Sequence, residues 1–338
     1  MNPFFFNFSN NMIRKLNKYL SVIATQSSIL VGGQAVIEGV LMRVPGAYAT
    51  AVRDPNGEIL FDRHLFNSIL EKYNLKNIII LRGMVGLFES MKIGFQTLQW
   101  SADIAESNEE ESKTNPILEF FLSLLSIFFV LSIFFIGPLS LTSFIIEKDM
   151  IGNPMYYNLM AGSFRILFFL IYLIIISNIN DVYRLFQYHG AEHKTVYNFE
   201  SGEKLDIQTA QKFPTQHPRC GTSFVFIIMI VGIITFSIID SIFIYYFGSL
   251  DLLSRIIMHI LFIPLVAGFG YEILKLTAKY KTNIIFKILA KPGLWLQNIT
   301  TKTPSDDQLE VAIAALKCAF GDTIQKYEGK EHIAEAIE

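Results

Sequence analysis

The amino-acid sequence predicts a mainly α-helical, polytopic membrane protein with about four transmembrane helices and a small cytoplasmic α+β layer that includes a β-hairpin. This prediction rests on composition, on four long apolar stretches and on one turn motif. Hydrophobic residues make up 51% of the 338 residues, and charged residues only 17%. Because a soluble domain usually carries about 25% charged residues, this composition favours a membrane protein.

Four stretches are long and apolar enough to cross a bilayer as helices, which takes roughly 20 residues each. They are approximately Leu118–Thr142, Tyr156–Ser177, Thr222–Phe247 and Leu252–Leu276. We therefore expect three parts: an N-terminal segment over 1–115, a membrane domain over 116–277 that contains a site loop at 178–221, and a helical tail over 278–338.

The distribution of Lys and Arg predicts the orientation of these spans. Eleven precede residue 116, five lie between the second and third spans, and nine follow residue 271, whereas the other two loops contain only Lys148. Since cytoplasmic loops carry the excess of positive charge, both termini and the site loop are expected in the cytoplasm. Arg14, Lys15 and Lys18 suggest an interfacial helix near the N-terminus.

The segments outside the spans carry their own structural signals. Two extended runs, Ala47–Arg53 and Glu58–Leu65, flank the turn residues 54–57 and predict a β-hairpin. The glycine-rich segment 31–39 fits a strand that packs closely against a neighbour. Ile78–Trp100 has the spacing of an amphipathic helix, and Ser305 with Gln308 forms a capping box that begins another helix.

The main candidate site is the motif His189-x-x-Glu192-His193. On a helix, the two histidines project from one face and can bind the same metal ion. This order is the inverted form of the zincin motif, in which the glutamate acts as a general base. The alternative interpretation is a pair of surface histidines that bond to loop carbonyls, and Gly190 inside the motif weakens a helix by about 1 kcal/mol relative to alanine.

A metal site needs a third ligand from elsewhere in the chain. His217 and Cys220, just before the third span, are the nearest candidates, and Glu200 and Glu203 are possible oxygen ligands. Imidazole and thiolate ligands suit zinc, so a divalent transition metal, zinc above all, is the expected cofactor.

Other charged residues also stand out. Glu38 and Arg43 are expected to pair either with each other or with the site loop. Arg165 and Asp240 lie at matching depths in the second and third spans and are expected to form an ion pair, with Arg255 as the weaker partner for Asp240. The net charge of −2 and the lack of a basic stripe argue against nucleic-acid binding.

Five motifs together resemble the YqhQ-like family of bacterial membrane proteins. They are GGQAVIEGVLMR at 32–43, RGMVGLFESMKIG at 82–94, YHGAEHKTV at 188–196, HPRCGTSF at 217–224 and TPSDDQLEVAIAAL at 303–316. The resemblance runs from about residue 30 to residue 320. The family is of unknown function and is sometimes labelled a predicted metal-dependent enzyme. The resemblance implies a bacterial inner membrane and places His189, Glu192, His193, His217 and Cys220 in the family's pattern.

The sequence thus favours a metal-dependent hydrolase at the cytoplasmic face of the membrane, acting on a peptide or a lipid-linked substrate. His189 and His193 are the expected ligands, with His217 or Cys220 as a third and Glu192 as the base. The alternative is a non-catalytic assembly or scaffold factor with a structural metal. A transporter is a weaker alternative, because charges within the spans are few.

Overall fold

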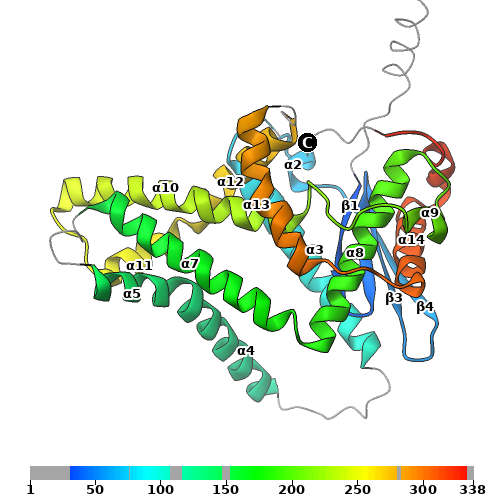
Figure 1. Cartoon of the computed structure of the whole chain (residues 1–338), viewed down its shortest axis with the longest axis horizontal. Coiled ribbons are helices and arrows are strands. Elements are labelled where there is room, and N and C mark those ends of the chain that lie inside the picture. The colour runs from blue at the N-terminus through cyan, green and yellow to red at the C-terminus, as the bar shows by residue number, and fades with distance from the viewer. Residues whose placement is uncertain (1–30, 76, 107–115, 147–152, 280–282, 333–338) are drawn as a thin grey trace, which may run out of the picture.

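The computed structural model describes residues 31–75, 77–106, 116–146, 153–279 and 283–332. A four-stranded sheet with helices on both faces stands at one end, and a bundle of long apolar helices extends away from it (Figure 1). The interfacial helix expected around Arg14 lies outside the described residues.

The sheet is an antiparallel meander of β1 (Gly32–Val36), β2 (Gly39–Val44), β3 (Ala47–Arg53) and β4 (Ile59–Leu65), in that spatial order. The predicted hairpin is confirmed as β3 and β4, with Arg53 opposite Ile59. The glycine-rich segment forms the edge strand β1. The central strand β2 was not expected from the sequence.

One face of the sheet carries the main core of the molecule. Helices α8 (Asn180–Ser201) and α14 (Asp306–Phe320) cover this face. Met42 and Ala49 from the sheet are fully buried with Leu309 and Leu316 of α14. Alternate residues of a strand point to opposite faces, so the apolar side chains of β2 and β3 anchor both helices. The capping box at Ser305 is confirmed, because the Ser305 and Gln308 side chains each accept the other residue's backbone N–H.

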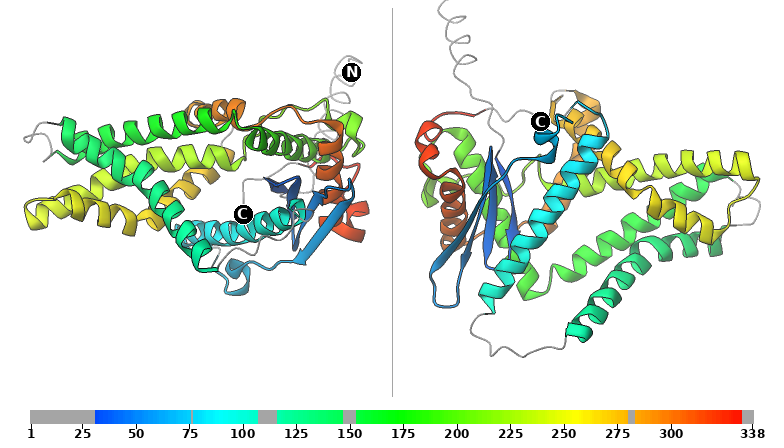
Figure 2. Two further views of the ribbon diagram at one scale, coloured as in Figure 1. Left: turned by 90° about the horizontal axis from the view of Figure 1, so that it is seen from below. Right: turned by 180° about the vertical axis from the view of Figure 1, so that it is seen from behind.

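Helix α3 (Leu81–Ala105) lies between the sheet and the bundle (Figure 2). Its packed side carries Ile93 and small residues such as Gly94, where an added Cβ would lie 2.6 Å from the Gln34 amide oxygen. Its large apolar side chains face outward, because Phe88 and Phe95 are 66% and 69% exposed. The predicted amphipathic helix is therefore present, with its large apolar residues on its exposed side.

The apolar bundle contains the predicted spans. The first runs through α4 (Pro116–Leu131), the π-helical turn η1 (Ser132–Ile136) and α5 (Gly137–Ile145). The next helices are α7 (Pro154–Ile176) and α10 (Gly221–Phe247). Among the described residues, these three helical runs are long and apolar enough to cross a membrane.

The fourth predicted span is a broken helix. It consists of α11 (Leu252–Leu261) and α12 (Ile263–Lys279), which meet at Phe262 with a bend of 52°. Pro264 explains the break, because proline has no N–H and its ring clashes with the carbonyl four residues earlier. Counting this pair as one span gives up to four.

Several shorter elements complete the described chain. They are α2 (Ile69–Lys72), α9 (Ile207–Ala210), α13 (Ile284–Thr300) and the 3-10 turn η2 (Gly321–Lys326). Helix α13 packs against the start of α10, where an added Cβ on Gly293 would lie 2.6 Å from Ser223. This close approach brings the C-terminal end of α13 to the candidate site.

The predicted ion pair between Arg165 and Asp240 is wrong. The carboxylate of Asp240 instead lies 3.1 Å from Nε of Arg255 and 3.0 Å from Nε2 of His259. Arg165 contacts the other ring nitrogen of His259, at 3.4 Å. The tight turn before α11 returns Arg255 to the depth of Asp240, and the imidazole of His259 separates the two residues that were expected to pair.

Candidate metal site

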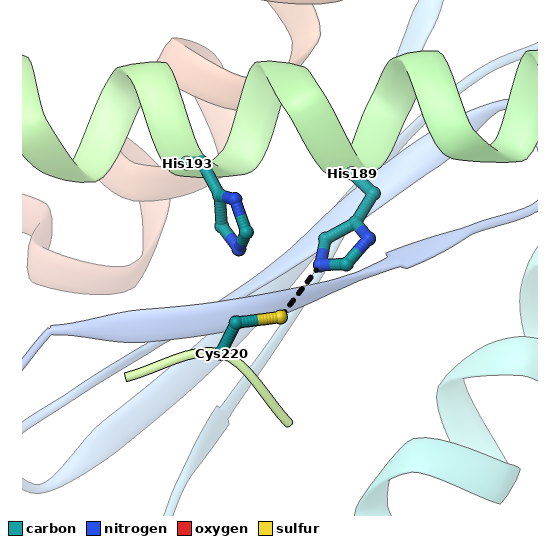
Figure 3. A group of neighbouring side chains, drawn as sticks. All are labelled: His189, His193 and Cys220. Carbon is teal, nitrogen blue, oxygen red and sulfur yellow. Dashed lines mark hydrogen bonds between the residues drawn. The ribbon is translucent and has the colours of Figure 1, made fainter. Parts of the chain in front are cut away.

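The His189-x-x-Glu192-His193 motif lies in the middle of α8. This helix ends at Gly202, which takes a left-handed conformation with φ of 70°, as glycine readily does at a helix C-terminus. His189 and His193 project from the same face, with ring centroids 4.5 Å apart. Figure 3 shows both rings directed toward Cys220.

Both histidines are held through the same ring nitrogen. Nδ1 of His189 lies 2.8 Å from the backbone carbonyl oxygen of Thr300, and Nδ1 of His193 bonds to the carbonyl oxygen of Thr215. A carbonyl oxygen can only accept, so each Nδ1 carries the proton and each Nε2 presents a lone pair. Metal-binding histidines are oriented in this way in many proteins.

The sulfur of Cys220 lies close to the rings of both histidines. This Sγ atom lies 3.2 Å from Nε2 of His189, and Cys220 is the N-cap of α10. The ligand atoms of His189, His193 and Cys220 all lie within 4.8 Å of one another. A tetrahedral zinc ion with bonds of about 2.0–2.3 Å holds its ligand atoms about 3.5 Å apart, so a small closure of the group accommodates the ion.

Burial sets the protonation of two groups at this position. Desolvation lowers the pKa of His189, which favours the neutral imidazole that a metal requires. Burial also raises the pKa of Glu192 to about 7, against the opposing effects of His189, Arg219 and a hydrogen bond from the backbone N–H of Gly33. The Glu192 carboxylate lies 3.4 Å from Nε2 of His193, and its raised pKa suits a group that takes up and releases a proton near neutral pH.

The structure separates the two candidates for a third ligand. Cys220 lies with the histidines, whereas the His217 ring centroid is 5.5 Å from that of His193. Nδ1 of His217 accepts the backbone N–H of Arg219 at 3.3 Å, and its Nε2 lies 4.0 Å from the Glu200 carboxylate. Glu200 in turn forms an ion pair with Arg219, and the side chain of Glu203 is exposed.

Gln297 is a site residue that sequence reasoning missed. This fully buried side chain of α13 accepts the backbone N–H of His217 at 2.6 Å and donates to its carbonyl at 2.9 Å. It therefore fixes the segment that carries Thr215 and Cys220. The carbonyls of Thr215 and Thr300 leave no signal in a sequence, because every residue has the same backbone oxygen.

Glu38 and Arg43 have different partners. Glu38, in the turn between β1 and β2, forms a two-pronged ion pair with Arg184 of α8 and accepts a hydrogen bond from Tyr188 at 3.2 Å. The guanidinium of Arg43 lies 4.4 Å from the ring centre of Phe66. Of the two expected arrangements, Glu38 thus contacts the site helix.

The comparison with known proteins agrees with the resemblance carried by the motifs. Residues 78–322 match the family described as "Protein of unknown function (DUF1385)". The uncharacterized protein YqhQ of Bacillus subtilis (strain 168) is 33% identical over 295 residues, which cover 83% of this chain and 89% of that protein. No solved structure matches the chain. The chain therefore belongs to the YqhQ-like family, whose shared region carries the description of unknown function.

Proposed function

We propose that the chain is a membrane-bound, metal-dependent hydrolase with a zinc ion held by His189, His193 and Cys220. One observation carries the proposal: two backbone carbonyls hold the Nδ1 atoms, and one ligand atom from each of His189, His193 and Cys220 lies within 4.8 Å of the other two. Two surface histidines that merely bond to loop carbonyls would not need a buried cysteine between them.

The donor set fits a catalytic zinc ion. Two imidazoles and a thiolate are typical zinc ligands, and three protein ligands leave one position free, as in catalytic rather than structural sites. A zinc ion bound there supplies Lewis acidity and lowers the pKa of water toward 7.

Glu192 is the proposed general base. Glu192 lies three residues after His189 and directly before His193 in the helix. Its carboxylate is nevertheless not part of the cluster formed by the ligand atoms of His189, His193 and Cys220. Its pKa of about 7 lets the carboxylate accept a proton from water and return it to a leaving group. Gly33, which donates to this carboxylate, is exposed at the edge strand β1, so a substrate approaching β1 comes close to Glu192.

The proposed location is the cytoplasmic face of a bacterial inner membrane. Strand β1 and helix α14 share one core with the site helix, so the described ends of the chain lie on the side of the bundle where the site lies. With an even number of spans and the Lys and Arg excess on that side, both termini face the cytoplasm. A site at this position suits a peptide or lipid-linked substrate presented at the membrane surface.

The test compares wild type with Glu192→Gln after both are loaded with zinc. Each is incubated with a bacterial membrane extract, and released products are identified by mass spectrometry. We expect products only with wild type, while both proteins hold one zinc ion per chain. Equal product formation by the two proteins would remove Glu192 from the mechanism, and a chain without zinc would refute the whole proposal.

Burial favours a second candidate, a structural zinc site in a membrane scaffold. His193 and Cys220 are only 2% and 7% exposed, and the site joins α8, α10 and the end of α13. X-ray absorption spectroscopy of the zinc-loaded protein separates the two functions. Two nitrogens, one sulfur and one exchangeable oxygen support the hydrolase, whereas a third nitrogen from His217 closes the coordination sphere and supports the scaffold.

A further inference from the structure

A second polar cluster lies inside the apolar bundle, away from the metal site. Asp240 of α10 is fully buried and contacts Arg255 and His259 of α11, and its carboxylate also accepts the Asn158 amide of α7 at 2.7 Å. Arg165 of α7 joins the cluster through His259. Ionisable groups among apolar helices are costly and usually serve a function.

The charges of this cluster do not balance. The cluster contains two guanidinium groups but one carboxylate: Asp240 pairs with Arg255, and among the described residues no acid forms an ion pair with Arg165. Nε2 of His259 donates a hydrogen bond to Asp240, and Nδ1 of His259 accepts one from Arg165. A neutral imidazole has this arrangement of one donor and one acceptor. At least one positive charge is therefore left without a counter-charge among the described residues.

The arginines also have donors without acceptors. Arg255 is 1% exposed and its Nε pairs with the Asp240 carboxylate at 3.1 Å, whereas its Nη2 makes no hydrogen bond within the described chain. Nε of Arg165 is likewise buried without a partner. A buried donor without an acceptor costs about 1–3 kcal/mol, and more when it is charged. The cluster therefore has both the charge and the donors to receive an anion.

Two irregular helical segments flank the cluster. The Arg165 guanidinium lies 5.6 Å from the ring centre of Phe135, which belongs to the π-helical turn η1. His259 lies three residues before the break at Phe262. Such turns recur at functional sites, and interrupted helices form ligand sites in membrane proteins.

We propose that Arg165 and Arg255 bind one phosphate group, which enters from the end of the bundle remote from the sheet. Arg255 is three residues from the start of α11, about 4.5 Å at 1.5 Å per residue, and α11 begins at that remote end (Figure 1). Guanidinium groups on two different helices suit the tetrahedral oxygens of phosphate. The phosphate is either the headgroup of an anionic lipid or a free ion, and the experiment distinguishes these sources.

The experiment uses the full chain in nanodiscs. In the first arm, native mass spectrometry counts phosphatidylglycerol retained from mixed phosphatidylcholine and phosphatidylglycerol discs. In the second arm, calorimetry measures the binding of inorganic phosphate in discs of phosphatidylcholine alone. We expect one bound phosphate group per chain in one of the arms, and Arg255→Gln or Arg165→Gln should weaken its binding about tenfold or more.

Two further variants keep the test decisive if these substitutions prevent folding. Asp240→Asn removes the competing carboxylate, so it should strengthen phosphate binding, whereas a purely structural cluster predicts no such gain. Lys317→Gln, on the exposed side of α14, removes one charge elsewhere and should leave binding unchanged. Binding in neither arm by folded wild type, or equal binding by wild type and Asp240→Asn, overturns the proposal.

Discussion

The backbone carbonyl of Lys302 occupies the space beside Gly190 in which any other residue would place a side chain. A Cβ built on Gly190 would lie 2.0 Å from that oxygen. The contact is part of a docked segment, because the N–H of Lys302 donates to the carbonyl of Phe186 at 2.9 Å. Two residues before Lys302, the carbonyl of Thr300 holds His189. Gly190 therefore leaves room for the segment that orients His189, although glycine lowers the helix propensity at this position.

We predict that Gly190→Ala destabilises the protein although alanine is the better helix former. Overpacking of this kind costs about 1–3 kcal/mol, which exceeds the gain of about 1 kcal/mol in helix propensity. The displaced segment should also release His189 and lower the affinity for zinc. Thermal unfolding and zinc titration measure both effects.

Gly86→Ala is the matched control for this substitution. Gly86 also lies inside a helix, but an added Cβ there meets nothing within 4 Å. Alanine at this position should stabilise the protein by about 0.4–1 kcal/mol. If Gly190→Ala and Gly86→Ala both gained stability, the Lys302 carbonyl could not lie as close to Gly190 as the structure places it.

The proposed ligand set leads to a second prediction. Purified wild type should contain one zinc ion per chain, and His193→Ala or Cys220→Ala should lose it, because two remaining ligands hold zinc weakly. His217→Ala should keep its zinc, since His217 faces Glu200. Elemental analysis of the three variants decides the matter. Zinc loss in His217→Ala with retention in Cys220→Ala would mean that the third ligand was assigned to the wrong residue.

A third prediction concerns Gln297, which positions the backbone of His217 from α13. Gln297→Ala leaves all three proposed ligands in place but frees the segment that holds Thr215 and Cys220. Loss of such supporting contacts typically lowers metal affinity about 10–100-fold, and competition with a chelator measures the change. Gln99→Ala removes an exposed amide of α3 and should bind zinc like wild type. An unchanged zinc affinity in Gln297→Ala would show that Gln297 is not needed to position the proposed ligands.

Features set by local composition could be predicted from the sequence. The apolar runs around 118–142, 156–177 and 222–247 correspond to helices because each has a continuous hydrophobic composition. The hairpin at 47–65 follows from its turn residues, and the Ser305 cap from its spacing to Gln308. The two histidines share a face because they are four residues apart in a helix.

The remaining features depend on contacts between distant residues. Strand β2 has no turn signal in the sequence, because Ile37 and Glu38, which connect it to β1, are not usual residues for a two-residue hairpin turn. The partner of Asp240 depends on the angle at which α11 packs against α10. This angle cannot be derived from the depth of each residue along its helix. Likewise, the position of Cys220 beside the two histidines depends on a segment that Gln297 holds, 80 residues away from His217 in sequence.

The fourth prediction concerns Glu38, which has a positive φ of 52°. Its ion pair with Arg184 is partly exposed, with side-chain exposures of 26% and 52%, so it contributes about 1 kcal/mol or less. A left-handed conformation costs a non-glycine residue about 1–2 kcal/mol, and glycine avoids this cost. Glu38→Ala loses the ion pair and keeps the strain, whereas Glu38→Gly loses the pair and relieves the strain. We therefore expect Glu38→Gly to be about 1 kcal/mol more stable than Glu38→Ala in chemical unfolding, and equal stabilities would contradict the left-handed turn.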